Sequence, residues 1–159
     1  MGIQEKKGLQ YPLERKKMIK LVEQKDMWSC AICCAAMVAG ISWEEAVEES
    51  PVRGTGLTPM ELDILLGNLG LEFERYMLPA FKACDAHILT VPSLNLLGGG
   101  HYVVADTSDE IFKVYDPQYG KKGKKFYARD ANDETGIQIS SYCEVIRIIR
   151  TKTSTKKGG

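Results

Sequence analysis

The chain has 159 residues, a length that suits one domain with a single hydrophobic core. Lysine plus arginine and aspartate plus glutamate number 21 each, so the overall charge favours neither nucleic acid nor an anionic membrane as a partner. No apolar run approaches the roughly 20 residues of a transmembrane helix. Five cysteines without a disulfide-framework spacing indicate a reducing, cytoplasmic compartment. The oligomeric state is left open.

Charge and patterning divide the chain into three parts. We expect a charged N-terminal arm over residues 1–17, a folded domain over residues 18–150, and a basic flexible tail over residues 151–159. A further basic run, "KKGKK", occupies residues 121–125. Basic runs of this length are typical of solvated loops and tails.

The first half of the domain carries helix signals. Residues 18–24 are expected to form a short strand or an extended segment, and the apolar run that follows has Ser29 as its N-cap and stops at Gly40. A capping box starts a second helix over residues 42–50 and a third over residues 58–70, where Gly70 is the expected terminator. The predicted buried stripe of the third helix is Met60, Leu62, Ile64, Leu65 and Leu69.

The second half has strand signals. Alternating or β-branched segments occur at residues 71–78 and 87–95, in a hairpin over residues 101–117, and at residues 123–129 and 142–150. Helices followed by strands that pair in antiparallel fashion indicate an α+β fold, with the N-terminal helices packed on the sheet.

The hairpin predicts a histidine beside an aspartate. If the turn at residues 107–110 is symmetric, Ala105 faces Phe112, Val103 faces Val114, and His101 faces Asp116 on one side of the sheet. An aspartate in this position orients an imidazole and stabilises its protonated form. A half-exposed surface pair beside a glycine loop, residues 98–100, is the alternative interpretation.

Three cysteines lie at the start of the first predicted helix. Cys30 occupies its first turn, where free N–H groups and the helix dipole favour a thiolate. Cys33 and Cys34 lie deeper, and core packing is the expectation for both. Two alternatives remain at this point: a structural zinc site formed by Cys30, Cys33, Cys84 and His87, and a redox dithiol of Cys30 and Cys33.

Gln24 stands six residues before Cys30. Its side-chain amide is suited to converge with the backbone N–H of Cys30 on one point, which would form an oxyanion hole. Gln24, Cys30, His101 and Asp116 therefore supply, in this order, the groups that nucleophilic attack on an amide requires.

This order resembles the papain-like cysteine peptidases, and more narrowly the bacteriocin-processing, double-glycine peptidases and their small stand-alone bacterial and phage relatives. In the first block of that family, "QKDMWSCAICCAAM" keeps Gln24, Cys30, Cys34, Ala36 and Met37 in register. The second block, a His-Tyr-Val-Val strand followed by Asp-Pro, is matched by "HYVVAD" and "VYDP".

The resemblance covers roughly residues 18–120. It implies a papain-like fold and a peptidase with Cys30 as nucleophile, His101 as general base and acid, Asp116 as the orienting residue and Gln24 as oxyanion donor. It also implies a peptide or protein substrate and no cofactor. Ser29 and Ala31 replace the acidic residue and the glycine of the family pattern, and the methyl group of Ala31 is expected to crowd the substrate beside the nucleophile. An inactive relative that binds peptide in the same groove is the remaining alternative.

Overall fold

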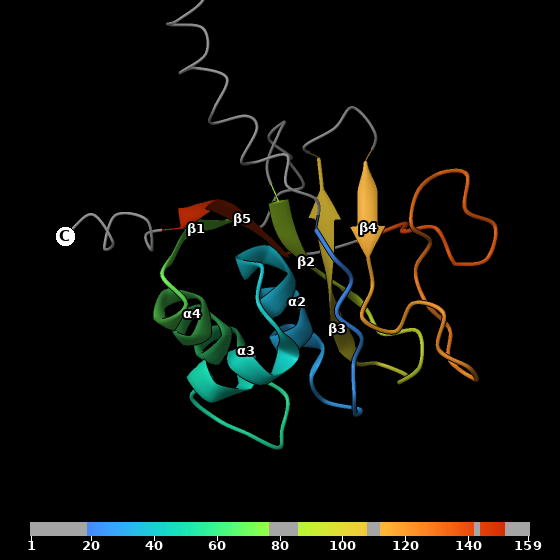
Figure 1. Ribbon diagram of the computed structural model, residues 1–159. Helices are drawn as coiled ribbons and strands as arrows, with labels where there is room; N and C mark the ends of the chain where they lie inside the picture. Colours follow the sequence, from blue (N-terminus) through green and yellow to red (C-terminus); the bar gives the residue numbers. More distant parts are fainter. Residues whose placement is uncertain (1–18, 77–85, 108–111, 142–143, 152–159) are drawn as a thin grey trace, which may run out of the picture.

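The computed structural model describes residues 19–76, 86–107, 112–141 and 144–151. Within these ranges three helices precede five strands, which confirms the α+β fold (Figure 1). The helices are α2 (Cys30–Ala39), α3 (Trp43–Glu49) and α4 (Pro59–Asn68). The strands are β1 (Leu71–Tyr76), β2 (Ala86–Pro92), β3 (Gly100–Asp106), β4 (Lys113–Tyr115) and β5 (Glu144–Thr151).

Several predictions fall outside the described residues. These are the arm at residues 1–17, the tail beyond Thr151, Cys84 and most of the hairpin turn. Thr151 itself belongs to β5 and pairs with Leu71, so the folded part extends one residue further than the predicted boundary.

The five strands form one antiparallel sheet in the order β1-β5-β2-β3-β4. The last strand in the sequence, β5, is inserted between β1 and β2. The chain therefore closes the sheet with its C-terminal segment, and β4 is left at one edge beside β3 (Figure 1).

The helices cover one face of the sheet. Helix α2 packs on β2 and β3, α4 packs on β1, and α3 contacts both other helices. Seven of the ten residues of α2 are buried, mostly small ones, so this helix approaches the sheet closely and is apolar around most of its circumference. The preceding residues 19–24 form an extended segment without a strand partner, one of the two predicted outcomes.

A second apolar cluster lies on the other face of the sheet. It consists of Leu89, Val91, Val103, Ala105, Val114, Tyr127 and Val145. The segment predicted as a strand at residues 123–129 contributes only an isolated bridge between Tyr127 and Ile137, so that prediction is wrong. Its backbone instead bonds to loop residues, with the N–H of Ile137 donating to Phe126 and the N–H of Ala128 donating to Ile137.

The helix ends follow the predicted signals with one exception. Ser42 and Thr58 each start a helix with a complete capping box. Gly40 adopts the left-handed conformation, with φ of 74°, that ends α2. Ser29, however, makes no side-chain cap: its backbone, with φ of −97° and ψ of 26°, lacks the extended conformation of Ser42 and Thr58, and its hydroxyl accepts a hydrogen bond from the indole Nε1 of Trp43.

The buried stripe of α4 differs from the prediction. Leu62, Leu65 and Leu66 are buried, whereas Met60 and Ile64 are exposed by 71% and 44%. The sheet meets only one side of this helix, and the buried positions follow the spacing i, i+3, i+4.

The hairpin register also differs from the prediction, by two residues. Ala105 pairs with Val114, and Val104 pairs with Tyr115. A slip of two residues preserves the faces of a strand, whereas a slip of one residue would exchange them. His101 and Asp116 therefore remain on one face, but they are diagonal neighbours near the end of the hairpin and not directly opposed residues.

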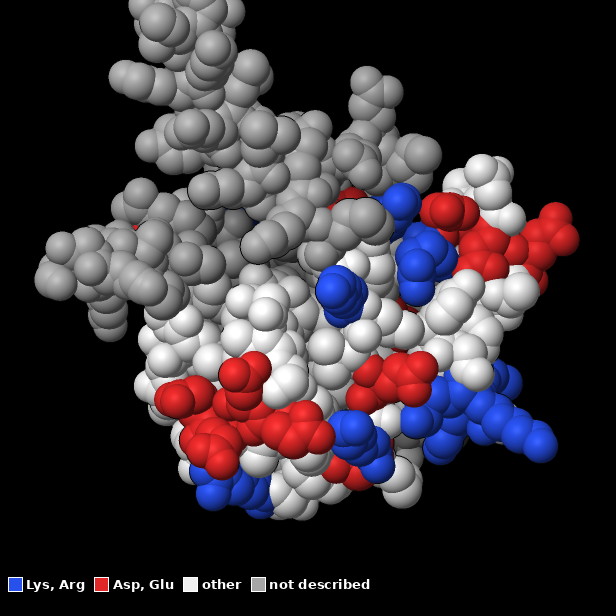
Figure 2. Space-filling view, viewed as in Figure 1, with Lys and Arg blue, Asp and Glu red and all other residues white. Residues whose placement is uncertain are grey.

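The surface carries both charge signs. Figure 2 shows acidic and basic side chains on the same face of the molecule. No single helix among the described residues is long and apolar enough to span a membrane, and α2 and α3 pass such a test only as a pair bent by 106°.

The exposure pattern of α4 gives a test of the core. We expect Leu66→Ala to lower the free energy of unfolding by about 2–5 kcal/mol, because Leu66 is fully buried and its truncation leaves a cavity. The matched control Ile64→Ala, on the exposed side of the same helix, should cost less than about 1 kcal/mol. Equal losses in urea denaturation would contradict the packing described for α4.

Candidate active site

Cys30 is the first residue of α2, and the turn before it is shaped by Asp26. One carboxylate oxygen of Asp26 accepts hydrogen bonds from the N–H groups of Trp28, at 3.1 Å, and Ser29, at 2.8 Å. The carbonyl of Ser29 accepts the first intrahelical bond, from Cys33. This turn directs the start of α2 toward the start of β3, and Cys30 is only partly buried there.

Cys33 and Cys34 are fully buried in the core between the helices and the sheet, as the sequence predicted. Burial raises the pKa of the Cys33 thiol to about 12 and raises the pKa of Cys34 well above its ordinary value. Both groups are therefore neutral thiols at physiological pH. Cys30 alone of these three lines a cleft.

The structure brings His101 and Asp116 together. The imidazole Nε2 lies 2.7 Å from a carboxylate oxygen of Asp116, whose side chain is 1% exposed. The carboxylate also accepts hydrogen bonds from the N–H groups of Gln118, at 2.9 Å, and Tyr127, at 2.8 Å. Three donors thus hold this buried carboxylate in one orientation.

Cys30 and His101 line the same cleft, and the thiol is one of the groups that act on the pKa of the imidazole. Because Nε2 is engaged by Asp116, Nδ1 is the ring nitrogen that remains for other partners. Burial of His101 disfavours its charged form, but the interactions with Asp116 and Cys30 outweigh burial and raise the pKa of the imidazole from 6.5 to about 9. At neutral pH the ring is therefore protonated and can stabilise a thiolate beside it.

Gln24 completes this arrangement from the extended segment before α2. Its backbone N–H donates to the carbonyl of Pro117, at 2.9 Å, and its carbonyl accepts from the Nζ of Lys121, at 2.7 Å. These bonds join the segment before α2 to the loop after β4. The residue is 2% exposed, yet its Oε1 has no hydrogen-bond partner among the described residues.

These residues line a cleft of about 110 Å³. Besides Gln24, Cys30, His101 and Asp116, its wall contains Met27, the loop between β2 and β3, and part of the loop after β4. Gly98 in the first of these loops has a φ of 77°, a conformation that favours glycine. Ala31 is not part of the wall: it is 1% exposed and packs in the core. The expectation that its methyl group crowds the substrate is therefore wrong, since the side chain points away from the cleft.

The zinc alternative requires Cys33 and His87 to meet at one point, and the fold separates them. Cys33 packs with Ile88 on the helix-covered face of the sheet. Because β2 pairs with β3 without a bulge, its residues alternate, and His87 lies on the opposite face from Ile88. Cys84 lies outside the described residues. Among the residues that the structure describes, no three His, Cys, Asp or Glu side chains are grouped to hold a metal ion.

The redox alternative pairs Cys30 with Cys33, and the structure forms no disulfide between these two cysteines. Cys30 interacts with His101, whereas Cys33 is enclosed in the core beside Ser29. The two cysteines thus have different environments.

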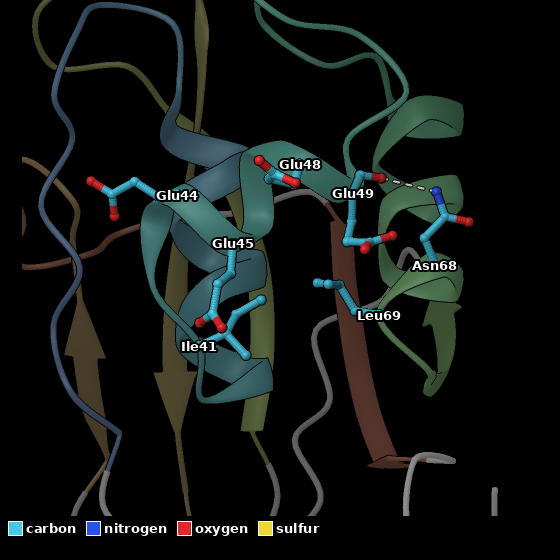
Figure 3. Close-up of a pocket in the computed structure, with 7 residues that line it drawn as sticks. All are labelled: Ile41, Glu44, Glu45, Glu48, Glu49, Asn68 and Leu69. Carbon is cyan, nitrogen blue, oxygen red and sulfur yellow. Dashed lines mark hydrogen bonds between the residues drawn. The ribbon is translucent and has the colours of Figure 1, made fainter.

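A larger pocket, of about 440 Å³, lies apart from these residues, on α3 and α4 (Figure 3). Four glutamates of α3 surround it, and Ile41 and Leu69 contribute apolar surface. Asn68 of α4 reaches across to donate to the carbonyl of Glu49 at 2.9 Å. The pocket is lined by no nucleophile or imidazole, so size alone does not identify the reactive site.

Comparison with solved structures places the fold. No protein-family model matches the sequence, and a search of curated proteins returns no match. The chain is similar to the peptidase domain of Streptococcus ComA, a bifunctional ABC transporter of a quorum-sensing pathway, with a TM-score of 0.56 and 20% identity over 82% of this chain and 98% of that domain. The chain has a papain-like peptidase fold.

A second solved structure supports this assignment. A double-glycine motif protease from an AMS/PCAT transporter, solved in complex with its leader peptide, matches with a TM-score of 0.50 and 17% identity. The match covers 82% of this chain and 92% of the protease. The structural similarity spans most of both folds although few side chains are shared.

Several supporting groups were not identified from the sequence. The role of Asp26 had only a weak signal in the sequence: aspartate is a residue type that commonly bonds the backbone N–H groups two or three residues further on. The contacts from Pro117, Gln118 and Tyr127 use backbone atoms, which residue identity does not reveal.

The environment of His101 predicts a titration that NMR can follow. In the wild-type protein the imidazole should titrate with a pKa of about 9. In Asp116→Asn we expect the pKa to fall toward 6.5, because the negative hydrogen-bond acceptor is lost while burial remains. Identical titrations in the two proteins would contradict the role of Asp116 in this interaction.

The same shift has a consequence for stability, with a defined sign. The pKa of His101 is higher in the folded protein than in the unfolded chain. The stabilisation that its protonated ring gains from Asp116 is therefore fully present below pH 6.5 and is lost as the pH rises through about 9. Between pH 6.5 and about 9, the free energy of unfolding of the wild-type protein should therefore decline more steeply than that of Asp116→Asn, as measured by urea denaturation at a series of pH values.

Proposed function

We propose that the protein is a cysteine peptidase in which Cys30 attacks a peptide or protein amide. The observation that carries the proposal is the buried Asp116–His101 hydrogen bond, in a cleft that Cys30 also lines. A protonated, oriented imidazole beside a thiol at a helix N-terminus is the arrangement that activates a cysteine nucleophile. The similarity to two peptidase domains supports this function.

In the proposed reaction, the Cys30 thiolate adds to the carbonyl carbon, and the negative charge moves to the carbonyl oxygen. The His101 imidazolium then protonates the leaving amine as the acyl-enzyme forms. The neutral imidazole next removes a proton from water, which attacks the thioester, releases the acid and regenerates the Cys30 thiolate beside the His101 imidazolium. Asp116 keeps the ring in one orientation through both steps.

Gln24 is proposed as the oxyanion donor together with the backbone N–H of Cys30. The first N–H groups of a helix have no intrahelical partner, so the N–H of Cys30 is available to a bound oxygen. The Gln24 side chain lines the same cleft as Cys30. Its unpartnered Oε1 is an acceptor, so the proposed donor to the substrate oxygen is the Nε2 group of the same amide.

The first test concerns the nucleophile. At neutral pH we expect iodoacetamide to label Cys30 in preference to Cys33 and Cys34, because the latter are buried neutral thiols. Cys30→Ala should abolish peptide hydrolysis without loss of the folded state, whereas Cys33→Ala should retain the labelling of Cys30. Site mapping by mass spectrometry measures the first effect.

If Cys30 resists thiol-directed reagents while the protein is folded, the peptidase proposal is wrong. A binding protein that holds peptide in the same cleft would then be the better description. Labelling of a buried cysteine ahead of Cys30 would equally contradict the mechanism.

The second test concerns the oxyanion donor. Gln24→Ala should lower kcat by about 10²–10³-fold, because the removed donor acts mainly on the charge that develops in the transition state. KM should change much less. Gln138→Ala removes an amide that bonds to the carbonyl of Asp130 outside the cleft, and it should alter kcat by less than about twofold. A Gln24 variant with near wild-type kcat would exclude the proposed donor.

A further inference from the structure

The loop after β4 forms one wall of the cleft and carries the basic run at residues 121–125. Figure 2 shows basic side chains at the lower right of the molecule, where Figure 1 shows this loop. Lys124 and Lys125 line the cleft together with Cys30 and His101, and both are exposed. The sequence suggested a solvated loop; the structure brings two of its charges to the candidate active site.

The backbone of this wall is held in place. The side chain of Asn95, in the loop between β2 and β3, accepts a hydrogen bond from the N–H of Lys125 and donates one to its carbonyl, both at 2.9 Å. Lys121 anchors the other end of the run through its bond to the carbonyl of Gln24. The lysines beside the cleft therefore extend from a fixed backbone.

The positive charges of the wall are not neutralised within the described part of the chain. No ion pair there joins Lys122, Lys124 or Lys125 to a carboxylate. Among the described residues that line the cleft, the one carboxylate is Asp116, which is buried and engaged by three donors. A molecule in the cleft thus meets an excess of positive charge.

From this wall we infer that the cleft selects peptide substrates with an aspartate or glutamate close to the scissile bond, and that Lys124 and Lys125 determine this specificity. The inference rests on the proposed peptidase function, because it assigns the substrate class of the same site. Exposed charges at the wall of a cleft act mainly on substrate capture and are screened by salt, so the preference should weaken as salt increases.

The first experiment measures the local potential at Cys30 without a known substrate. Iodoacetate and iodoacetamide alkylate a thiol in the same way but differ by one negative charge. In Lys124→Glu/Lys125→Glu, the ratio of the iodoacetate rate to the iodoacetamide rate at Cys30 should fall at least about threefold at low ionic strength. The fall should largely disappear in 1 M salt.

The matched control is Lys20→Glu/Lys113→Glu, which makes the same change in net charge at positions that do not line the cleft. Its rate ratio should equal that of the wild type. An unchanged ratio in the cleft variant, or an equal fall in the control, overturns the inference. If iodoacetamide still labels Cys30 normally, the proposed nucleophile stands although the inference about charge is wrong. Failure of the specificity inference can thus be distinguished from failure of the proposed peptidase function.

The second experiment uses a fluorogenic peptide that the wild-type protein cleaves, with Glu, Gln or Lys placed in turn at each of the four positions on either side of the cut. At one or more positions, kcat/KM should follow the order Glu, Gln, Lys, and the cleft variant should lose or reverse this order. A wild-type preference for Gln or Lys at every position would refute acidic specificity even if hydrolysis is efficient.

Discussion

The buried carboxylate of Asp116 is the interaction on which the rest of the site depends. It fixes His101 from β3, and it accepts N–H groups from Gln118 and from Tyr127, eleven residues along the chain. The next residue, Pro117, supplies the carbonyl that holds the backbone of Gln24. Two consecutive residues after β4 thus connect the sheet, the loop beyond it and the segment that leads into α2. Loss of this carboxylate would leave several buried donors without a partner.

The helical layer has to approach the sheet closely for this connection to form. Helix α2 achieves this because its buried positions are mainly alanine and cysteine, whose small side chains leave little separation between helix and strands. A helix with larger residues in this position would move its first turn away from the start of β3. The composition of α2 therefore affects the distance between the thiol and the imidazole as well as the packing of the core.

Local signals in the sequence predicted the helices well. The capping boxes at Ser42 and Thr58 and the terminator at Gly40 depend on contacts within a few residues, so they could be read from the sequence. The exposure of Met60 and Ile64 could not be predicted, because it depends on which side of α4 faces the sheet. The predicted strand at residues 123–129 failed for a similar reason. Its backbone bonds mainly to the loop around Ile137, and it meets β4 only through the bond from the N–H of Val114 to the carbonyl of Arg129, so no continuous ladder forms.

The candidate site was partly predictable. The hairpin pattern placed His101 near Asp116 although the assumed register was wrong, because an error of two residues leaves the faces unchanged. The backbone donors to Asp116 and the turn formed by Asp26 could not be inferred, since they depend on how distant segments meet. The position of Lys124 and Lys125 beside the cleft likewise required the path of the loop after β4.

The backbone contacts around Asp116 have a consequence for sequence divergence. A hydrogen bond from a main-chain N–H or to a main-chain carbonyl constrains the path of the chain, but it places little restriction on the side chain at that position. The bond from residue 118 can therefore be kept when its side chain changes, whereas Tyr127 is also constrained by the packing of its ring in the second apolar cluster. A fold supported in this way can be preserved in proteins that share only 17–20% of their residues, as in the two solved peptidase domains. For such a scaffold, resemblance in three dimensions will outlast resemblance between sequences.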